Sequence, residues 1–230
     1  MQKASSHKLL EVACFDPESC FTAGQAGADR IEFCRDYGSG GLTPLRDDIL
    51  KVRERLSIPL HVIIRPRAGG FVYSAEEMET MKRDILFCKA QRVDGLVFGV
   101  LTANNEIDVP ANQALVELCA GLPCTFHRAV DACPDPETAF GGIIHAGFRR
   151  VLTSGGRASA SEGIEQLKRL QKKFGREITI MPGGGIRSHN IGLIARETQC
   201  PEFHSAALIA GKSAVDAHEV SLIKEHISHD

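Results

Sequence analysis

Charged and histidine side chains interrupt short apolar runs that otherwise have the composition of buried strands. Glu11 lies within Leu-Leu-Glu-Val-Ala, and Glu32 lies within Arg-Ile-Glu-Phe-Cys. The later runs carry, at or near their carboxyl ends, Arg65, His127, Arg128 and His204. An unpaired charge is costly inside a protein, so these groups are expected to compensate one another at one place. Carboxylates beside a histidine can move protons near neutral pH, whereas arginines bind anions.

The residues alone leave two interpretations open. The groups form either a structural ion cluster that closes the protein interior or a polar pocket that grips a small ligand. We favour the pocket, because acids, bases and a histidine converge on it from several different runs. If the pocket is an enzyme site, the candidate catalytic residues are Glu11, Glu32 and His127.

Two glycine-rich turns, at residues 153–156 and 182–186, follow two of the later runs. Backbone N–H groups in such turns hold phosphate or carboxylate groups; the alternative is a tight turn that needs a positive φ. With the basic and histidine side chains, the turns give these ligand-binding candidates: Arg65, Arg128, Ser154, Gly183, Gly184, Gly185, His204 and Ser205. Asp131 is expected on a surface loop and is a further candidate for the pocket.

Eight cysteines occur without CxxC or Cys/His finger spacing, and the chain does not resemble a secreted disulfide scaffold. Side chains alternate across a strand. If Glu11 and Glu32 face the interior, Cys34 faces it too, whereas Cys14 points to the other side. A thiolate at Cys34 suits Cu(I) or could act as a nucleophile. The alternative is a small side chain that fills a crowded position.

The elements that must position these residues alternate between strand and helix along the whole chain. Apolar β-branched runs predict strands at residues 9–15, 30–34, 60–65, 95–101, 124–130, 149–153, 177–181 and 202–208. Apolar residues at three- and four-residue spacing predict helices between them, for example at 75–90 and 161–174. Eight such units predict a single-domain α/β protein over residues 1–230, a (β/α)8 TIM barrel with its site at the carboxyl ends of the strands. The alternative is an open doubly wound sheet, but no G-x-G-x-x-G turn follows the first strand.

Composition excludes several classes of partner. The 230 residues include 27 basic and 29 acidic ones, for a formal net charge of -2. No basic excess exists to bind nucleic acid or an anionic membrane, and the apolar runs fall short of the ~18 residues of a membrane helix. Glu11 breaks the first apolar stretch at once, unlike a secretion signal. We expect a cytoplasmic homo-oligomer, with a dimer as the commonest form.

Six segments near the predicted strand ends form an ordered set over nearly the whole chain. They are Ala-Asp-Arg-Ile-Glu-Phe-Cys at 28–34, Gly-Gly-Leu-Thr-Pro at 40–44, Ile-Arg-Pro-Arg at 64–67, Thr-Phe-His-Arg-Ala at 125–129, Arg-Val-Leu-Thr-Ser-Gly at 150–155 and Pro-Gly-Gly-Gly-Ile at 182–186. Together they resemble the CutC family of copper homeostasis proteins. The resemblance implies a cytoplasmic, commonly oligomeric barrel with a Cu(I) site at cysteines on the first two strands. Cys34 matches the second of those positions; Ala13 stands at the first, and Cys14 follows it.

Two functions from different classes follow. The first is a copper-handling protein that binds Cu(I) weakly through Cys34, with Cys14, a partner subunit or a methionine as a further ligand. The second is an enzyme that acts on a small anionic or phosphorylated metabolite through the acids, histidine and arginines named above. The thiol favours the first function. The number of charged side chains favours the second, because Cu(I) has little use for arginines.

Overall fold

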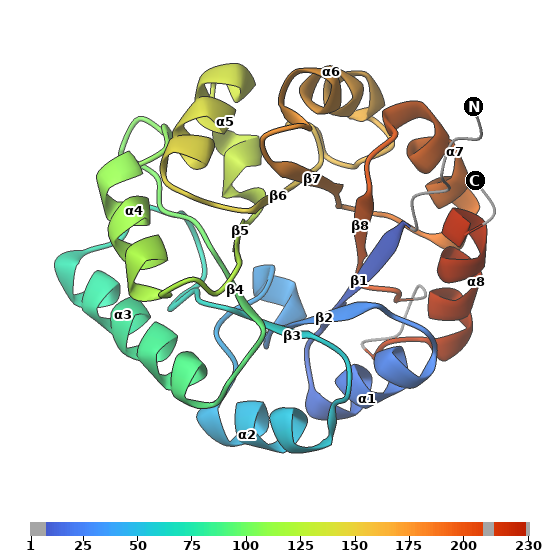
Figure 1. Ribbon diagram of the computed structural model, residues 1–230, viewed down its shortest axis with the longest axis horizontal. Helices are drawn as coiled ribbons and strands as arrows, with labels where there is room; N and C mark the ends of the chain where they lie inside the picture. The colour runs from blue at the N-terminus through green and yellow to red at the C-terminus, as the bar shows by residue number, and fades with distance from the viewer. Residues whose placement is uncertain (1–7, 209–213, 229–230) are drawn as a thin grey trace.

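The computed structural model describes residues 8–208 and 214–228, which form a ring of parallel strands surrounded by helices (Figure 1). The strands are β1 Leu9–Cys14, β2 Arg30–Phe33, β3 Leu60–Ile63, β4 Gly95–Phe98, β5 Cys124–Phe126, β6 Arg150–Thr153, β7 Thr179–Pro182 and β8 Glu202–Ser205. Hydrogen bonds join neighbouring strands in the order β7-β6-β5-β4-β3-β2-β1-β8, and β7 also contacts β8. The predicted TIM barrel is confirmed, and the open doubly wound sheet is excluded.

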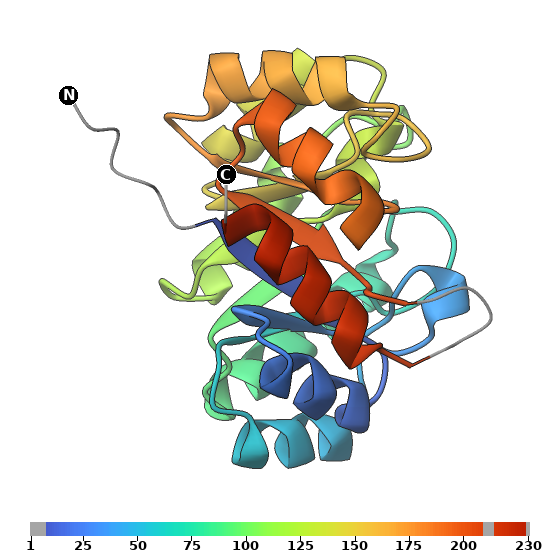
Figure 2. The same ribbon diagram turned by 90° about the vertical axis from the view of Figure 1, so that its right-hand side faces the viewer.

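One helix follows each strand and covers the outside of the ring (Figure 1). The helices are α1 Pro17–Gln25, α2 Arg46–Arg55, α3 Ala75–Ala90, α4 Val109–Leu118, α5 Pro136–His145, α6 Ile164–Phe174, α7 Ser188–Thr198 and α8 Ala217–Ser228. Figure 2 shows the barrel from the side, with α8 lying over β1. No helix within the described ranges has the length and apolar character that crossing a membrane requires.

Local sequence signals account for many of the element boundaries. The helix predicted at 75–90 has those bounds, because Ser74 and Glu77 form a capping box at its start. Pro110 lies in the first turn of α4, where a missing N–H is harmless. Gly27 and Gly147 adopt positive φ values of 101° and 91° after α1 and α5, as helix ends commonly require.

Six of the eight predicted strands extend too far toward their carboxyl ends; those predicted at 149–153 and 177–181 do not. The run at 124–130 is a strand only to Phe126, and a short 3₁₀ helix follows at Arg128–Ala132. The run at 95–101 is a strand only to Phe98. Apolar composition continues past the last ladder hydrogen bond because the loops at the barrel mouth, meaning the carboxyl ends of the strands, also pack over the core.

The hydrophobic core lies between the strands and the helices. Leu10, Val12 and Phe33 belong to the large buried cluster that includes the helix side chains. A second, small apolar cluster lies in the lumen and consists of Cys34, Ile63 and Val97, with Phe15 packed against it. The alternation that sends aliphatic side chains outward therefore sends the charged ones of β1 and β2 into the lumen.

Gly95 tests how tightly the lumen is packed. A Cβ atom at this position would lie 2.4 Å from Nε2 of the buried His61 ring, so Gly95→Ala should lower the free energy of unfolding by roughly 2–3 kcal/mol, as overpacked cores do. Gly192→Ala in α7 is the matched control, because its Cβ would meet nothing within 4 Å and alanine favours the helix by about 0.5–1 kcal/mol. Urea unfolding of both variants gives the comparison. Wild-type stability for Gly95→Ala would contradict this packing.

Candidate functional site

Glu11 lies inside the lumen, below the barrel mouth. Its Cα pairs with Arg30 on β2 and with His204 on β8, and its side chain is fully buried. Glu11 Oε2 accepts a hydrogen bond from Arg30 Nε at 2.5 Å, and Oε1 lies 2.8 Å from His204 Nδ1. From the sequence we expect the charged side chains to compensate one another at one place, with Glu11 beside Arg65 or His127 at the barrel mouth. That expectation is corrected, because the partners of Glu11 are Arg30 and His204. The next inward-facing position of β1, nearer the mouth, is Ala13.

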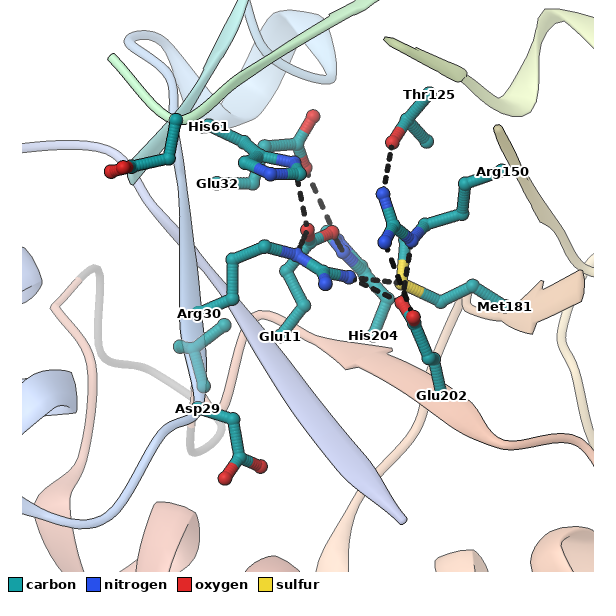
Figure 3. Close-up of polar contacts among 12 residues, drawn as sticks. Glu11, Asp29, Arg30, Glu32, His61, Thr125, Arg150, Met181, Glu202 and His204 are labelled. Atoms are coloured by element: carbon teal, nitrogen blue, oxygen red, sulfur yellow. Dashed lines mark hydrogen bonds and ion pairs between the residues drawn. The ribbon is translucent and has the colours of Figure 1, made fainter. Parts of the chain in front are cut away.

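Arg30 connects Glu11 to a second buried acid. Arg30 Nη2 donates to Glu202 Oε2 at 2.6 Å, and Arg150 Nε donates to the same oxygen at 2.5 Å (Figure 3). Arg150 Nη1 also donates to Thr125 Oγ1 at 3.2 Å. We call the six residues Glu11, Arg30, Glu32, Arg150, Glu202 and His204 the inner ion network. It crosses the lumen below the mouth, so one part of the structural interpretation holds: several charges compensate one another inside the barrel.

His204 links the two carboxylates of the inner ion network. With Nδ1 on Glu11, its Nε2 lies 3.5 Å from Glu32 Oε2. Burial would lower the pKa of His204, but the hydrogen bond to Glu11 and the charges of Glu32 and Glu11 outweigh it and raise that pKa. Burial would likewise raise the pKa of Glu11, but Arg30 and then His204 hold it well below its usual range. Both shifts favour the charged forms of Glu11 and His204.

Glu32 is the acid of the network without an arginine partner of its own. Burial, opposed by His204 and reinforced by the Glu11 charge, raises the pKa of Glu32 to about 7. A carboxyl that titrates near neutral pH can both give and take a proton under working conditions. This is the property expected of a general acid or base.

Glu32 also lies at the wall of a cavity at the barrel mouth, which we call the mouth cavity. Its volume is about 120 Å³. Its lining residues are Ala13, Phe15, Glu32, Cys34, Gly40, Ile63, Arg65, Phe71, His127, Arg128, Leu152 and His204. The structure thus brings together at one cavity six of the predicted site residues: Glu32, Cys34, Arg65, His127, Arg128 and His204.

Arg65 and His127 form the basic wall of the mouth cavity. Arg65 Nη1 donates to the carbonyls of Ser39 and Gly41 at 2.7 and 2.9 Å, and Nη2 donates to the Gly69 carbonyl at 2.8 Å. Its Nε has no hydrogen-bond partner among the described residues, and neither has Nε2 of His127. Both side chains are about 5% exposed.

The His127 ring is held neutral. Its Nδ1 accepts the N–H of Ala129 at 3.4 Å, so a neutral ring carries its proton on Nε2. Burial and the nearby Arg65 charge lower the pKa of His127 to about 3. The side chain of Phe71 lies against both groups, 4.8 Å from the His127 ring and 5.0 Å from the Arg65 guanidinium. The wall therefore offers buried N–H donors from one cation and one neutral ring.

The two cysteines proposed as copper ligands lie on opposite faces of the sheet. Cys14 is part of the core between sheet and helices, whereas Cys34 belongs to the lumen cluster and lines the mouth cavity. Burial, and then the Glu32 charge, raise the pKa of the Cys34 thiol well above its usual value. Among the described residues, one group of three potential ligand side chains lies close enough together to hold a metal ion. It consists of Glu11, Glu32 and His204 and includes no thiol.

The first glycine-rich turn, at residues 153–156, binds an anion that belongs to the chain itself. The N–H groups of Ser154 and Gly156 donate to the carboxylate of Asp131, each at 3.1 Å. Gly183 donates its N–H to the Thr153 carbonyl at 2.9 Å. The Asp131 side chain is 11% exposed, so the expectation of a surface loop residue is corrected.

Ser205 lies apart from the mouth cavity. It follows the inward-facing His204 and points to the helix side, where its hydroxyl donates to the Ile186 carbonyl at 2.8 Å. The strand alternation that placed Cys14 outside the lumen could have excluded Ser205 as well.

Sequence reasoning missed Arg30, His61, Arg150, Glu202 and Phe71. The first four face the lumen at the amino ends of strands, where charged residues are easily taken for solvated strand starts. Their alternation with Glu32 and the inward residues of β8 is the signal that could have found them. Phe71 lies in the loop after β3, and nothing in its local sequence points to the cavity.

A larger hollow of about 510 Å³ lies outside the barrel, between the start of α4 and α5. Its walls are mainly apolar, and its acids include Asp135, which caps α5. The buried ionisable groups lie at the smaller mouth cavity, so we assign the candidate site there.

Comparison with known proteins shows close relatives over most of the chain. The CutC family model matches residues 8–209. A CutC family protein of Bacteroides thetaiotaomicron is 47% identical over 205 residues, which cover 89% of this chain and 82% of that protein. A human protein named copper homeostasis protein cutC homolog is 43% identical over 204 residues, covering 89% of this chain and 75% of the human one.

Solved structures agree with the barrel. The crystal structure of CutC from Streptococcus agalactiae is 32% identical, with a TM-score of 0.83, and the match covers 86% of this chain and 98% of that one. Phosphoribosyl anthranilate isomerase of Thermotoga maritima has a TM-score of 0.68 at 11% identity, covering 97% of this chain and 100% of that one. The second likeness shows the shared fold alone.

The pKa of Glu32 makes stability depend on pH. The folded carboxyl keeps its proton to about pH 7, whereas the unfolded one loses it near ~4.5. The native state therefore loses stability as pH rises through this window, and the loss is complete above about pH 7. Since one pKa unit is ~1.4 kcal/mol, Glu32→Gln should gain up to about 3 kcal/mol relative to wild type between pH 5 and pH 8.

Urea unfolding at each pH measures this difference. Glu165→Gln, on the exposed face of α6, is the control and should follow the wild type at every pH. A constant difference between Glu32→Gln and wild type would show that Glu32 ionises at its ordinary pKa.

Proposed function

Because the chain belongs to the CutC family, we propose that the family's function is carried in this protein by the mouth cavity, which binds a small anion and moves a proton on it through Glu32. The single observation that carries the proposal is that one small cavity is lined by both an acid and unpaired N–H donors. Glu32 forms its acidic wall, a buried carboxyl that titrates near neutral pH, and Arg65 and His127 form its basic wall, with buried N–H groups that have no hydrogen-bond partner among the described residues.

The basic wall supplies binding. An anion at Arg65 Nε and His127 Nε2 would satisfy two buried donors, each of which is costly to leave unpaired. The carbonyls of Ser39, Gly41 and Gly69 hold the Arg65 guanidinium in place before a ligand arrives. Because the donors are preorganised and shielded from water, they favour negative charge more strongly than they would in solvent.

The acidic wall supplies proton transfer. Glu32 takes a proton from the ligand or returns one, while His204 stays cationic on the Glu11 side. When Glu32 is ionised, the His204 cation stabilises the carboxylate at 3.5 Å; when Glu32 is protonated, Glu11 keeps His204 charged. The pair can therefore cycle between two protonation states without exposing a lone charge.

Glycolate is a suitable probe for the binding step, because it is a carboxylate small enough for a cavity of about 120 Å³. If glycolate binds with a Kd of about 2 mM, then 20 mM glycolate stabilises the protein by about 1.4 kcal/mol and raises Tm by roughly 3–5 °C over 20 mM chloride. Arg65→Met should abolish the shift. Arg46→Met, a half-exposed arginine on α2, should leave it intact.

Ala13→Leu provides an independent test, because it fills the cavity without removing a charge. A folded Ala13→Leu variant should show no glycolate shift. If wild type shows no shift, or if Ala13→Leu keeps it, the mouth cavity is not the anion site.

A second candidate function is copper handling in the cytoplasm, with weak Cu(I) binding at Cys34. Two observations favour it: relatives carry the name copper homeostasis protein, and the Cys34 thiol lines the mouth cavity. The donor set fits Cu(I) poorly, because Cu(I) prefers two or three soft ligands and Cys14 faces away from the cavity. Cys34 is the residue of the cavity lining whose side chain carries a sulfur atom that could bind Cu(I).

Ala13 on β1 and Cys34, one residue past β2, both line the mouth cavity. Ala13 pairs with Glu32, so Cys34 is its diagonal neighbour across strands about 4.8 Å apart. Ala13→Cys should therefore create a two-thiol site and tighten Cu(I) binding at least tenfold. Cys34→Ser should abolish the binding in both backgrounds, and Cys133→Ser, at a half-buried thiol outside the cavity, should change nothing. Competition with a chromophoric Cu(I) chelator under reducing conditions measures the affinities. An unchanged affinity in Cys34→Ser would mean that the thiol serves packing alone.

A further inference from the structure

Asp131 occupies the position of a bound anion in the turn after β6. One carboxylate oxygen accepts hydrogen bonds from Thr153 Oγ1 at 2.5 Å and from the Gly156 N–H at 3.1 Å, and the other accepts from Ser154 Oγ at 2.9 Å. The Ser154 N–H lies 3.1 Å from both oxygens. Gly155, between Ser154 and Gly156, donates its N–H to Thr153 Oγ1 at 2.9 Å. Two N–H groups and two hydroxyls therefore converge on one anion, as donors do in the nests that hold phosphate in other proteins.

The turn after β6 requires glycine at two positions. Gly155 and Gly156 adopt φ values of 74° and 70°, a backbone conformation that glycine adopts without steric cost. A Cβ at Gly155 would lie 2.8 Å from the Gly163 carbonyl oxygen, so another residue does not fit there. The chain therefore builds a nest and fills it with its own carboxylate.

Arg128 covers the second glycine-rich turn. Its Nε donates to Asp131 at 2.8 Å and its Nη2 to Ser154 Oγ at 2.9 Å. Its Nη1 lies 3.0 Å from the place that a Cβ of Gly184 would take. The Arg128–Asp131 ion pair thus lies across the turns after β6 and β7, at the end of the barrel where TIM barrels commonly bind a phosphate group.

We propose that this ion pair substitutes for a ligand phosphate, and that the mouth cavity takes a small carboxylate of about two to four carbons with no phosphoryl group. The inference rests on the proposed function, since it names the substrate class of the same cavity. A phosphoryl group at the turn after β6 would meet the Asp131 charge instead of free N–H groups. The cavity volume of about 120 Å³ is below the ~300–1,000 Å³ of pockets that hold larger ligands, which suits a short acid better than a phosphorylated sugar.

Glycolate and 2-phosphoglycolate form a matched pair of probes, because they differ by one phosphoryl group. Calorimetric titration of the wild type should give a Kd for 2-phosphoglycolate at least tenfold weaker than that for glycolate. Asp131→Ala empties the nest and should tighten 2-phosphoglycolate at least tenfold, while glycolate changes less than threefold. Adding Arg128→Met to Asp131→Ala should remove that gain, because the cation beside the nest is then lost.

Asp131→Asn is the second variant, in case Asp131→Ala does not fold. It keeps the shape and the acceptor oxygen but removes the charge, and it should tighten 2-phosphoglycolate by a smaller factor. The inference is overturned if wild type binds 2-phosphoglycolate as tightly as glycolate, or if neither variant gains affinity for it. If the wild type does not bind glycolate at all, the anion site itself is refuted. Failure of this inference and failure of the proposed function therefore give different results.

Discussion

The buried carboxylate of Glu11 is the constraint on which the lumen depends. An ionised group in this position costs several kcal/mol unless a partner is placed beside it. Arg30 supplies one partner at 2.5 Å and His204 the other at 2.8 Å. Arg30 also donates to a second acid, Glu202, so that one guanidinium bridges both carboxylates. A barrel interior that other proteins fill with aliphatic layers is filled here by compensating charges.

The same constraint explains why the residue nearest the cavity is poised near neutral pH. The charge of Glu11 is balanced by both Arg30 and His204. Among the described residues, Glu32 has no arginine partner of its own and is paired with His204. Its carboxyl therefore titrates at about 7, whereas the pKa of Glu11 is lowered. Two acids on adjacent strands have opposite properties because their partners differ. Acid–base roles commonly divide in this way between neighbouring groups.

The mouth shows a similar division between charges that are satisfied internally and those that remain for a ligand. Arg128 and Asp131 satisfy each other and the glycine turns. Arg65 gives its terminal nitrogens to loop carbonyls but keeps Nε without a partner among the described residues. The mouth cavity therefore offers unpaired donors of the kind that bind small anions. Its lining includes one thiol, Cys34, whereas Cu(I) prefers two or three soft ligands.

The sequence by itself determined the alternation of strands and helices, the barrel, and which side chains of each strand face the lumen, because these follow from local periodicity. The bounds of α3 and the opposite orientations of Cys14 and Cys34 were predictable on that basis. Depth within the lumen was not, because it depends on the register between strands that are distant in the chain. Only the tertiary structure placed Glu11 below the mouth beside Arg30, and only it brought the carboxylate of Asp131 into the turn after β6. The positions of Glu11 and Asp131 are both set by hydrogen bonds between residues distant in the chain, and local sequence patterns carry no information about such bonds.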